Sequence, residues 1–367
     1  MAEQQAGPPG FSVVPGAAVH RSLAGRRAEI IDLVEDAYRL HGEGRTVNPP
    51  SYFLRFPDRP TARIIALPAS VGGGVGAAGG AGADGEVRAA GGTGVDGIKW
   101  ISSFPTNLGL GIPRASALLL LNDPRTGYPY ACLEGSIISA VRTAASAASA
   151  ARRLAEQRGT PRRIGFFGTG LIARYIHDYL SEPGWHIDEF GVYDLSAEYA
   201  ASFAEQVLGP TGAPVRVHPD AESLVRSSDL IVFATTAATP HVVDPSWFDH
   251  NPLVLHVSLR DLGTDIVLRS ANVVDDVEHV LKADTSVHLA EQRTGDRDFL
   301  DATLYDVLTG KYTAPADRPV VFSPFGLGVL DLVVGAHVHR LATAAGDTVP
   351  IDGFFHELDR HQSAGTS

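Results

Sequence analysis

The chain has 367 residues, of which 44% are hydrophobic and 20% charged, and its formal net charge is −12 at pH 7. The length predicts two domains, each with its own core, and the acidic balance argues against a nucleic-acid partner or an anionic membrane surface. Cys132 is the only cysteine, so no internal disulfide can form, and with no visible signal peptide or long apolar run we expect a cytoplasmic protein.

The first third of the chain predicts one helix and several short strands. Apolar residues between positions 30 and 40 recur at helical spacing, and we expect a helix over 21–42 that ends at Gly42 and Gly44. The glycine- and alanine-rich residues 71–97 predict a flexible loop, and residues 123–127 (DPRTG) are typical of a hairpin turn. The strands expected here are 51–56, 63–67, 98–103, 116–122 and 130–134.

The rest of the chain alternates between strands and helices, which implies a doubly wound parallel sheet. An Ala- and Ser-rich helix over 142–158 leads into it, and a last helix over 328–343 is expected to return to the N-terminal part. The predicted fold class is α/β, with a Rossmann domain over 144–325 inserted in a split α+β domain of residues 1–143 and 326–367. The predicted Rossmann strands are 164–167, 190–194, 215–218, 230–235, 253–258, 273–275 and 320–323.

Residues 162–196 carry the most informative motif. Gly168, Gly170 and Ala173 follow an apolar strand in the G-x-G-x-x-A spacing of a dinucleotide-binding turn. Gly168 permits the tight turn, Gly170 leaves room for a pyrophosphate, and Ala173 lets the helix pack closely on the strand. The start of the helix offers N–H groups and positive dipole to the phosphates. The alternative is an ordinary turn of an α/β protein. The other cofactor-binding residues predicted in this turn are Thr169, Leu171 and Ile172.

Asp194 ends the second strand of this motif and indicates which dinucleotide binds. Its carboxylate can accept hydrogen bonds from both hydroxyls of an adenosine ribose, whereas a 2′-phosphate would meet a like charge. Leu195 and Ser196 supply no positive charge. NAD is therefore the expected cofactor, in preference to NADP.

Two basic residues carry candidate chemistry, each with a structural alternative. Lys99 lies in an apolar strand, where an ammonium group must be paired because burying it alone is costly. Alternatively, its stem packs while its head reaches water. Arg142 can hold a substrate carboxylate through two hydrogen bonds, with Thr143 beside it at the start of the Ala-rich helix. The alternative for Arg142 is a salt bridge between domains.

Two loops that follow predicted Rossmann strands lie where ligands bind such sheets. Asp261, in the segment HVSLRDLGTD (256–265), can act as a general acid or base, or it can simply cap a helix. The threonines that end the strand LIVFATT either bond the cofactor or form a turn. The histidines show no convincing metal-ligand spacing, so we expect no metal site. The predicted cofactor-binding residues of these loops are Thr235, Thr236, Ser258, Leu259 and Arg260.

Several segments taken together resemble the ornithine cyclodeaminase/mu-crystallin family, from about residue 22 to residue 341. The combination of IKW, LEGSIIS-x-x-RTAAS and SLRDL is specific. The segment NPPSYFLRFPDRPTARIIALPA (48–69) narrows the resemblance to a branch that forms 2,3-diaminopropionate for siderophores and peptide antibiotics. The other matching segments are IKWISSFPTN (98–107), NDPRTGYPYACLEGSIISAVRTAAS (122–146), GFFGTGLIAR (165–174), HVSLRDL (256–262) and LYDVLTGKY (304–312).

This resemblance implies an NAD-dependent dehydrogenase that converts N-(2-amino-2-carboxyethyl)-L-glutamate to 2-oxoglutarate and L-2,3-diaminopropionate. Lys99 and Arg142 match family positions that meet the substrate carboxylate, Thr143 matches a cofactor-contacting position, and Asp261 falls in the loop of the catalytic aspartate. The family also implies a homodimer formed through the non-Rossmann domain and a small amino acid as substrate.

The sequence departs from the family pattern at two places. The family's first-strand arginine aligns near Tyr52, and we assign its substrate-binding role to Arg55, the nearest arginine. The glycine-rich stretch before Lys99 is longer than the family needs. Two other functions stay open: an ornithine or lysine cyclodeaminase with catalytic NAD, and a mu-crystallin-like protein that binds a dinucleotide and a ligand. Asp194 disfavours the second, because those proteins prefer NADP.

Overall fold

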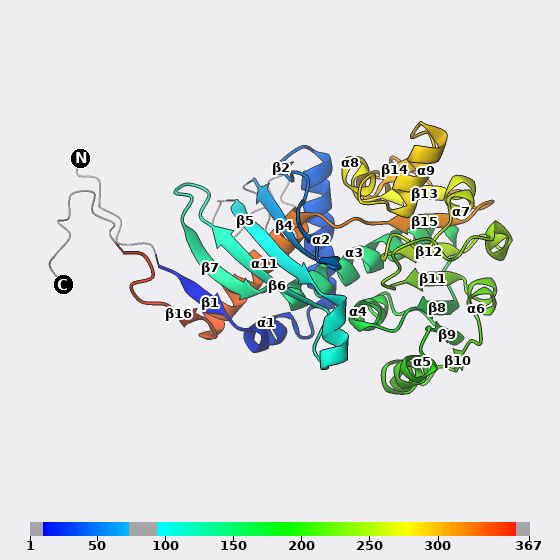
Figure 1. Cartoon of the computed structure of the whole chain (residues 1–367), viewed down its shortest axis with the longest axis horizontal. Coiled ribbons are helices and arrows are strands. Elements are labelled where there is room, and N and C mark those ends of the chain that lie inside the picture. Colours follow the sequence, from blue (N-terminus) through cyan, green and yellow to red (C-terminus); the bar gives the residue numbers. More distant parts are fainter. Residues whose placement is uncertain (1–9, 73–93, 357–367) are drawn as a thin grey trace. The chain divides into compact units, whose positions relative to one another are not determined.

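The computed structural model describes residues 10–72 and 94–356 of the chain, which divides into two compact units (Figure 1). The first unit comprises Met1–Arg26, Arg45–Ser139 and Asp331–Ser367, and the second comprises Arg27–Gly44 and Ala140–Leu330. Residues 27–44, expected from the sequence in the first domain, thus group with the second unit. Most of the glycine-rich stretch expected as a loop, residues 73–93, lies outside the described residues.

The first unit is built on an eight-stranded sheet in the order β16-β1-β7-β6-β5-β4-β2, with β3 also paired to β4. Its described neighbours are antiparallel except β1 and β7, which are parallel. The hairpin expected around residues 123–127 is confirmed, because β6 pairs antiparallel with β7. The strands are β1 (Ser12–Val14), β2 (Thr46–Val47), β3 (Tyr52–Phe56), β4 (Arg59–Val71), β5 (Val95–Ser103), β6 (Ala115–Asn122), β7 (Pro129–Glu134) and β16 (Val349–Pro350).

Side chains alternate between the two faces along each strand of this sheet. The side chains on one face are mainly apolar and buried, whereas the other face carries polar and apolar side chains. Leu119, Leu121 and Leu133 on the inward face are 0% exposed. Helix α11 (Gly328–Ala345) packs on this face, and a Cβ at Gly335 would lie 2.1 Å from Leu119 Cδ2. A glycine at this position therefore lets the helix approach the sheet closely.

The helix expected over 21–42 is wrong at its start. The structure has two helices instead, α1 (Gly16–Leu23) and α2 (Arg27–Gly42). The break has a backbone cause: Ala24 is extended and Gly25 has φ of +71°. Left-handed backbone of this kind ends a helix and favours glycine.

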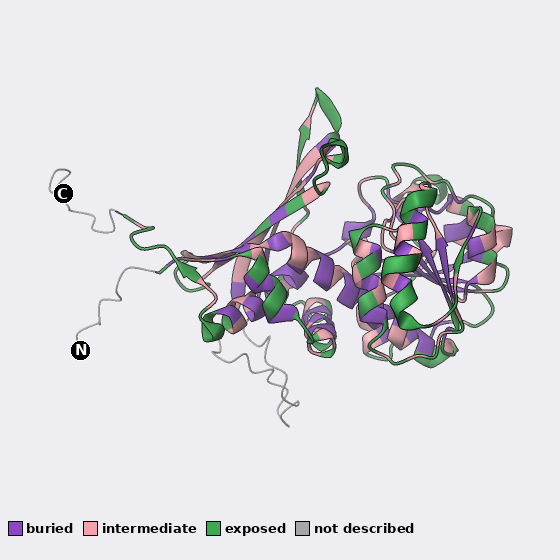
Figure 2. Cartoon of the chain, turned by 90° about the horizontal axis from the view of Figure 1, so that it is seen from below, coloured by how far each residue is buried: buried purple, intermediate pink, exposed green. Residues whose placement is uncertain are grey.

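The second unit contains an eight-stranded sheet in the order β10-β9-β8-β11-β12-β15-β13-β14, in which every neighbouring pair is parallel. The predicted α/β class with a doubly wound parallel sheet is confirmed. Four central strands are buried at every residue (purple in Figure 2), as expected for a sheet covered on both faces. The strands are β8 (Arg163–Phe167), β9 (Glu189–Tyr193), β10 (Val215–Val217), β11 (Leu230–Phe233), β12 (Leu253–His256), β13 (Ala271–Val274), β14 (Leu300–Thr303) and β15 (Val320–Ser323).

Helices connect the strands of this unit. No helix in the part of the chain that the structure describes is long and apolar enough to cross a membrane. Besides α1, α2 and α11, the α-helices are α3 (Gly135–Arg158), α4 (Leu171–Leu180), α5 (Ala197–Phe203), α6 (Ala221–Ser227), α7 (Thr264–Arg269), α8 (Val277–Val280), α9 (Ser286–Thr294) and α10 (Leu304–Leu308). Short helical turns are η1 (Pro105–Leu110) of the first unit, and η2 (Ala204–Leu208), η3 (Gly209–Thr211) and η4 (Pro245–Phe248) of the second.

Helix α3 starts earlier than the sequence indicated, at Gly135 rather than at residue 142. The Glu134 carboxylate caps it by accepting hydrogen bonds from the N–H groups of Ser136 (2.7 Å) and Ile137 (3.0 Å). Arg142 and Thr143 therefore lie about two turns inside the helix and not at its start.

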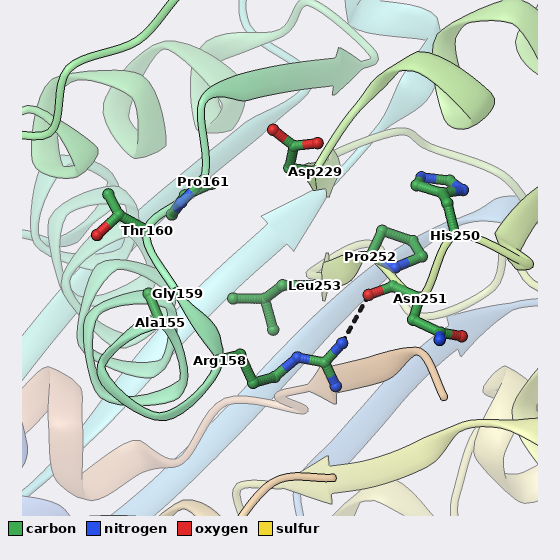
Figure 3. Close-up of a pocket in the computed structure, with 10 residues that line it drawn as sticks. All are labelled: Ala155, Arg158, Gly159, Thr160, Pro161, Asp229, His250, Asn251, Pro252 and Leu253. Carbon is green, nitrogen blue, oxygen red and sulfur yellow. Dashed lines mark hydrogen bonds between the residues drawn. The ribbon is translucent and has the colours of Figure 1, made fainter. Parts of the chain in front are cut away.

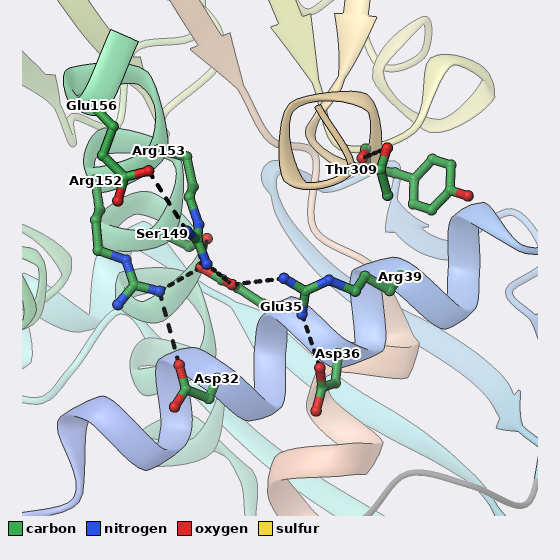
Figure 4. Close-up of polar contacts among 10 residues, drawn as sticks. Asp32, Glu35, Asp36, Arg39, Ser149, Arg152, Arg153, Glu156 and Thr309 are labelled. Carbon is green, nitrogen blue, oxygen red and sulfur yellow. Dashed lines mark hydrogen bonds and ion pairs between the residues drawn. The ribbon is translucent and has the colours of Figure 1, made fainter. Parts of the chain in front are cut away.

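A buried ion cluster joins α2 to α3 within the second unit (Figure 4). Glu35 of α2 is 2% exposed and accepts hydrogen bonds from the Arg152 and Arg153 guanidinium groups of α3, both at 2.7 Å. The Ser149 hydroxyl (2.9 Å) and the Arg39 guanidinium (3.1 Å) complete the shell. Burial alone would raise the pKa of Glu35, but these donors outweigh it and hold the pKa below its usual value.

Candidate active site

The glycine turn lies at the carboxyl end of β8, beside β11, where the strand order of the parallel sheet reverses. Gly168 has φ of +89°, and a Cβ there would lie 2.8 Å from the carbonyl oxygen of Ala234, so the turn requires glycine. A Cβ at Gly170 would meet nothing within 4 Å, which leaves open space at the N-terminus of α4. Ala173 belongs to α4 and is fully buried.

Asp194 is bound to the glycine turn itself. Its Oδ2 accepts hydrogen bonds from the Thr169 N–H (3.0 Å) and hydroxyl (2.8 Å), and its Oδ1 accepts one from the Ser196 N–H (2.9 Å). The carboxylate therefore holds the turn in shape, a role that the sequence did not indicate. Oδ2 thus uses both of its lone pairs, whereas Oδ1 keeps one for a ribose hydroxyl.

A cavity of about 330 Å³ adjoins the turn. Thr169, Gly170 and Leu171 line it from the start of α4, and Arg174 adds a positive charge to its wall. The sequence analysis missed Arg174, although its place one turn into the helix is the signal that would have found it. Ile172 is half-buried on the same turn. A helix N-terminus and a guanidinium together suit a diphosphate.

Asp261 is fully buried at the centre of a polar cluster. Its Oδ1 accepts hydrogen bonds from the Thr235 hydroxyl and from His241 Nε2 (3.0 Å). Its Oδ2 accepts one from the Ser258 hydroxyl and lies 3.3 Å from His256 Nε2. Burial would raise the pKa of Asp261, but the contacts with His241, His256 and Ser258 outweigh it and hold the pKa well below its usual range.

The residues around Asp261 that we predicted to contact the cofactor have protein partners. The Thr235 and Ser258 hydroxyls bind Asp261, and the Arg260 guanidinium donates to the carbonyl of Ala283 (2.7 and 3.1 Å). Leu259 is buried with φ of +69°, an uncommon conformation outside glycine. Thr236 alone of this set is exposed. These side chains shape the loop around Asp261.

Arg142 lies against a glycine that the sequence analysis did not single out. A Cβ at Gly326 (φ +92°) would lie 2.6 Å from one guanidinium nitrogen of Arg142. Asp275 holds this segment in place by accepting hydrogen bonds from the N–H groups of Phe325 (2.9 Å) and Gly326 (2.6 Å). Thr143 is half-buried next to Arg142 on α3. Because Gly326 has no side chain, it leaves room for the guanidinium of Arg142.

Lys99 belongs to the first unit, where it is 2% exposed and ion-paired. Its Nζ lies 2.6 Å from Asp331 Oδ2 and 3.2 Å from the Ser139 hydroxyl. The alternative in which its head reaches water is therefore wrong, and the expectation of a buried, paired ammonium group is confirmed. Asp331, 0% exposed in the first turn of α11, was not foreseen.

Arginine side chains gather on the same sheet face as Lys99. In the strand register Lys99 is opposite Leu67, and Ser103, two inward positions further along β5, is opposite Arg63. Arg63 is in turn opposite Arg55 of β3. The guanidinium of Arg114 donates to the Ser103 hydroxyl at 2.6 Å. We call Arg55, Arg63 and Arg114 the arginine cluster.

Arg114 is the informative member of the arginine cluster. It is half-buried, burial lowers its pKa, and it makes no ion pair with any residue that the structure describes. A half-buried cation without a counter-charge is costly unless an anion binds there. Arg55, the predicted substrate contact, is exposed and lies over the Phe53 ring. The sequence analysis named Arg55 and missed Arg63 and Arg114.

A second cavity, of about 250 Å³, lies at the opposite edge of the parallel sheet (Figure 3). It is lined by residues that precede or begin strands, among them Pro161, Asp229 and Leu253. Arg158 donates into the backbone here, to the Asn251 carbonyl at 2.6 Å. Ligands of doubly wound sheets bind at the carboxyl ends of strands, so this cavity is not the candidate site. Within residues 10–72 and 94–356, no group of His, Cys, Asp and Glu residues is arranged to hold a metal.

Comparison with known proteins identifies the family. The model of the ornithine cyclodeaminase/mu-crystallin family matches residues 87–345. The chain belongs to this family. The family membership expected from the sequence motifs is confirmed.

Three curated relatives match most of the chain. The nodulation efficiency protein NfeD of Rhizobium meliloti is 29% identical over 87% of this chain and 92% of its own length. Alanine dehydrogenase of Archaeoglobus fulgidus is 26% identical over 86% and 90%. The N-((2S)-2-amino-2-carboxyethyl)-L-glutamate dehydrogenase of Staphylococcus aureus is 26% identical over 85% and 89%.

Solved structures share the fold over nearly the whole chain. CmnK is 29% identical, with a TM-score of 0.80 over 95% of this chain and 100% of its own. The Thermococcus litoralis Δ1-pyrroline-2-carboxylate reductase, in complex with NADH and L-proline, is 24% identical, with a TM-score of 0.79 over 93% and 100%.

Proposed function

We propose that this family member is an NAD-dependent dehydrogenase that converts N-(2-amino-2-carboxyethyl)-L-glutamate to 2-oxoglutarate and L-2,3-diaminopropionate. The relative of that activity in Staphylococcus aureus and the alanine dehydrogenase of Archaeoglobus fulgidus both support amino-acid oxidation. The product would serve siderophore or peptide-antibiotic biosynthesis in the cytoplasm. The single cysteine, half-buried Cys132, suits a reducing compartment.

The observation that carries the choice of substrate is the arginine cluster on the Lys99 face. The proposed substrate has three carboxylates and two amino groups and is net anionic, whereas ornithine and lysine each have one carboxylate and two ammonium groups and are net cationic. Arg114, which has no counter-charge among the described residues, therefore favours the anionic substrate over the cationic ones. The four residue steps from Lys99 to Ser103 span ~13 Å, which long side chains can bridge to the two ends of an extended substrate.

The dinucleotide unit supplies the other half of the proposal. The glycine turn, the start of α4 and Arg174 would hold the diphosphate of NAD, and Asp194 would meet the ribose while it holds Thr169. When bound, NAD⁺ supplies the acceptor for the hydride that leaves the glutamyl Cα. The half-buried positions of Ile172 and Thr143 leave both as proposed cofactor contacts.

Substrate positioning falls to the basic residues. The family resemblance assigns the glutamyl α-carboxylate to Lys99 and Arg142, and each side chain has an orientation fixed within its own unit. Asp331 and Ser139 fix the ammonium group of Lys99, and the bare backbone of Gly326 admits the guanidinium of Arg142. A reactant held in one geometry loses less entropy on the way to the transition state, which is a large contribution to catalysis.

The test is NADH absorbance after purified protein is mixed with NAD⁺ and synthetic N-(2-amino-2-carboxyethyl)-L-glutamate. Two parallel reactions serve as comparisons: one contains L-ornithine in place of the proposed substrate, and the other contains NADP⁺ in place of NAD⁺. We expect NADH and 2-oxoglutarate in equal amounts from the first mixture. Ammonia and proline from ornithine, without net NADH, would instead assign a cyclodeaminase. Tight NADPH binding without turnover of either amino acid would assign a binding protein.

We also propose that the chain forms a homodimer through the outer face of the first unit's sheet. Tyr52, Trp100 and Leu118 are 64%, 45% and 51% exposed. The strand register places them in one row across β3, β4, β5 and β6, because Tyr52 is opposite Ala66, Ala66 opposite Trp100, and Trp100 opposite Leu118. A contiguous apolar row on an open face is typical of an interface between subunits.

A further inference from the structure

His241 forms an ordered pair with the buried Asp261. It follows β11 on the loop of residues 234–244, and its Nε2 lies 3.0 Å from Asp261 Oδ1. The backbone N–H of His241 also donates to the Asp261 carbonyl at 3.0 Å, and its ring centroid lies 5.3 Å from that of Phe167. The imidazole is thus fixed from two sides while 38% of its side chain stays exposed.

Asp261 is poorly suited to exchange protons itself. Its side chain is 0% exposed, and the four groups Thr235, His241, Ser258 and His256 surround its two oxygens. The contacts that lower its pKa keep it ionised at neutral pH. A carboxylate that does not take up a proton can still orient a histidine and stabilise its cation.

The ionised carboxylate fixes the tautomer of His241. Because a carboxylate only accepts hydrogen bonds, the proton of the neutral ring sits on Nε2, and Nδ1 carries the lone pair. Nδ1 makes no hydrogen bond with any residue in the described ranges. The basic nitrogen therefore has no partner among the described residues, on a side chain that is 38% exposed.

His241 and Asp261 lie at the edge of the parallel sheet where ligands usually bind. His241 and Asp261 follow β11 and β12, at the carboxyl ends of the parallel strands. The ring that His241 contacts, Phe167, directly precedes Gly168 of the glycine turn. Reactions on a bound dinucleotide take place at this edge in doubly wound sheets.

We propose that His241 exchanges the protons of the hydrolytic step, with Asp261 as the residue that positions it. The inference rests on the proposed function. Loss of hydride from the glutamyl Cα leaves a protonated imine. Nδ1 of His241 takes one proton from water as its oxygen bonds to the imine carbon, and then returns it to the amine nitrogen. The C–N bond breaks as the hydroxyl proton leaves to His241, which gives 2-oxoglutarate, diaminopropionate and one proton released to solvent.

The test measures the hydride-transfer step and the hydrolytic step separately in the variants His241→Ala and His241→Gln. Rapid mixing measures the first turnover of NADH, and quenching with borodeuteride traps any imine as substrate that carries deuterium at Cα. We expect one NADH per active site at close to the wild-type rate. Release of 2-oxoglutarate should be ~100-fold slower, because general acid–base catalysis contributes about that factor or more. Deuterated substrate should accumulate, and added imidazole should restore part of the rate in His241→Ala.

His186→Ala is the matched control, since its side chain is 81% exposed. In Asp261→Asn, imidazole ¹⁵N shifts should show His241 no longer fixed as the Nε2–H tautomer. Wild-type release of 2-oxoglutarate by both His241 variants would overturn the proposal, and so would equal slowing of the NADH burst and of product release. Failure of the wild type to form NADH would instead contradict the proposed function, so the two outcomes are distinguishable.

Discussion

At the scale of single residues, the proposed recognition of the substrate depends most on Arg114. Its guanidinium has the Ser103 hydroxyl as partner and no counter-charge among the described residues. A carboxylate that binds there forms a charge-assisted hydrogen bond worth about 1.5–3 kcal/mol. We therefore expect Arg114→Gln to lower kcat/KM for the proposed substrate by ~10- to 100-fold.

Two substrate analogues test this assignment. One replaces the glutamyl unit with 2-aminobutyrate and so lacks the γ-carboxylate, and the other lacks the carboxylate of the aminoethyl arm. The effect of Arg114→Gln should nearly vanish for one of the two. Arg125→Gln, whose side chain is 76% exposed, is the control and should change neither rate. An equal loss with both analogues would mean that Arg114 holds neither carboxylate.

The environment of Lys99 could be predicted from the sequence only in part. An ammonium group in the apolar strand Ile98–Trp100 had to be paired if buried, and this is what the structure contains. Its partner could not be found from the sequence, because Asp331 lies 232 residues further along the chain. Arg114 was missed for a similar reason: its importance comes from its place beside Ser103 on a shared sheet face.

At the scale of secondary-structure elements, Glu35 fixes α2 against α3, the helix that carries Arg142. Replacing Glu35 with Gln removes the buried charge that Arg152 and Arg153 bind and leaves them only the more distant and more exposed carboxylates of Asp32 and Glu156. We expect the free energy of unfolding to fall by about 3–5 kcal/mol, since that is the usual cost of breaking a buried ion pair. Chemical denaturation at pH 7 measures it, and Glu156→Gln (55% exposed), which removes only an exposed partner of Arg153, is the comparison that should cost much less.

The same cluster predicts acid sensitivity. The pKa of Glu35 lies below its ordinary value of 4.5, so the carboxylate stabilises the folded state fully above about pH 4.5. This contribution is lost as the pH falls through the folded-state pKa. Between pH 7 and pH 3 the wild type should therefore lose more stability than Glu35→Gln does. Parallel curves for the two proteins would contradict the role of Glu35.

The elements that the sequence misplaced have identifiable physical causes. Helix α3 begins at Gly135 because the Glu134 side chain caps it, whereas the run LEGSII resembles a strand. Strand β14 (Leu300–Thr303) escaped prediction because LDAT is short and has no apolar run, and it is held by its pairing with β13. The central strands β11, β12 and β15 were predictable, since they are short apolar runs buried on both faces.

At the scale of the whole molecule, the proposed homodimer depends on the outer face of the first unit's sheet. Trp100 and Leu118 are neighbours in the register, and their side chains are about half exposed in a single chain. In a two-fold dimer each substitution enters the interface twice, so a charge at either position meets its own symmetry mate or its neighbours. A Trp at the centre of an interface is often a residue whose truncation costs about 2 kcal/mol or more. An unpaired charge introduced at Leu118 would cost at least as much, because the interface removes it from water.

We therefore expect Trp100→Asp and Leu118→Asp to raise the dimer dissociation constant by at least ~30-fold each, since 1.4 kcal/mol is a factor of ten. Light scattering on a size-exclusion column at micromolar protein should find the wild type as a dimer and both variants largely as monomers. Val217→Asp, at a 45% exposed position in the second unit, is the matched control and should stay dimeric. If all three variants remain dimers, the subunits associate through another surface, and the apolar row must then have a different partner.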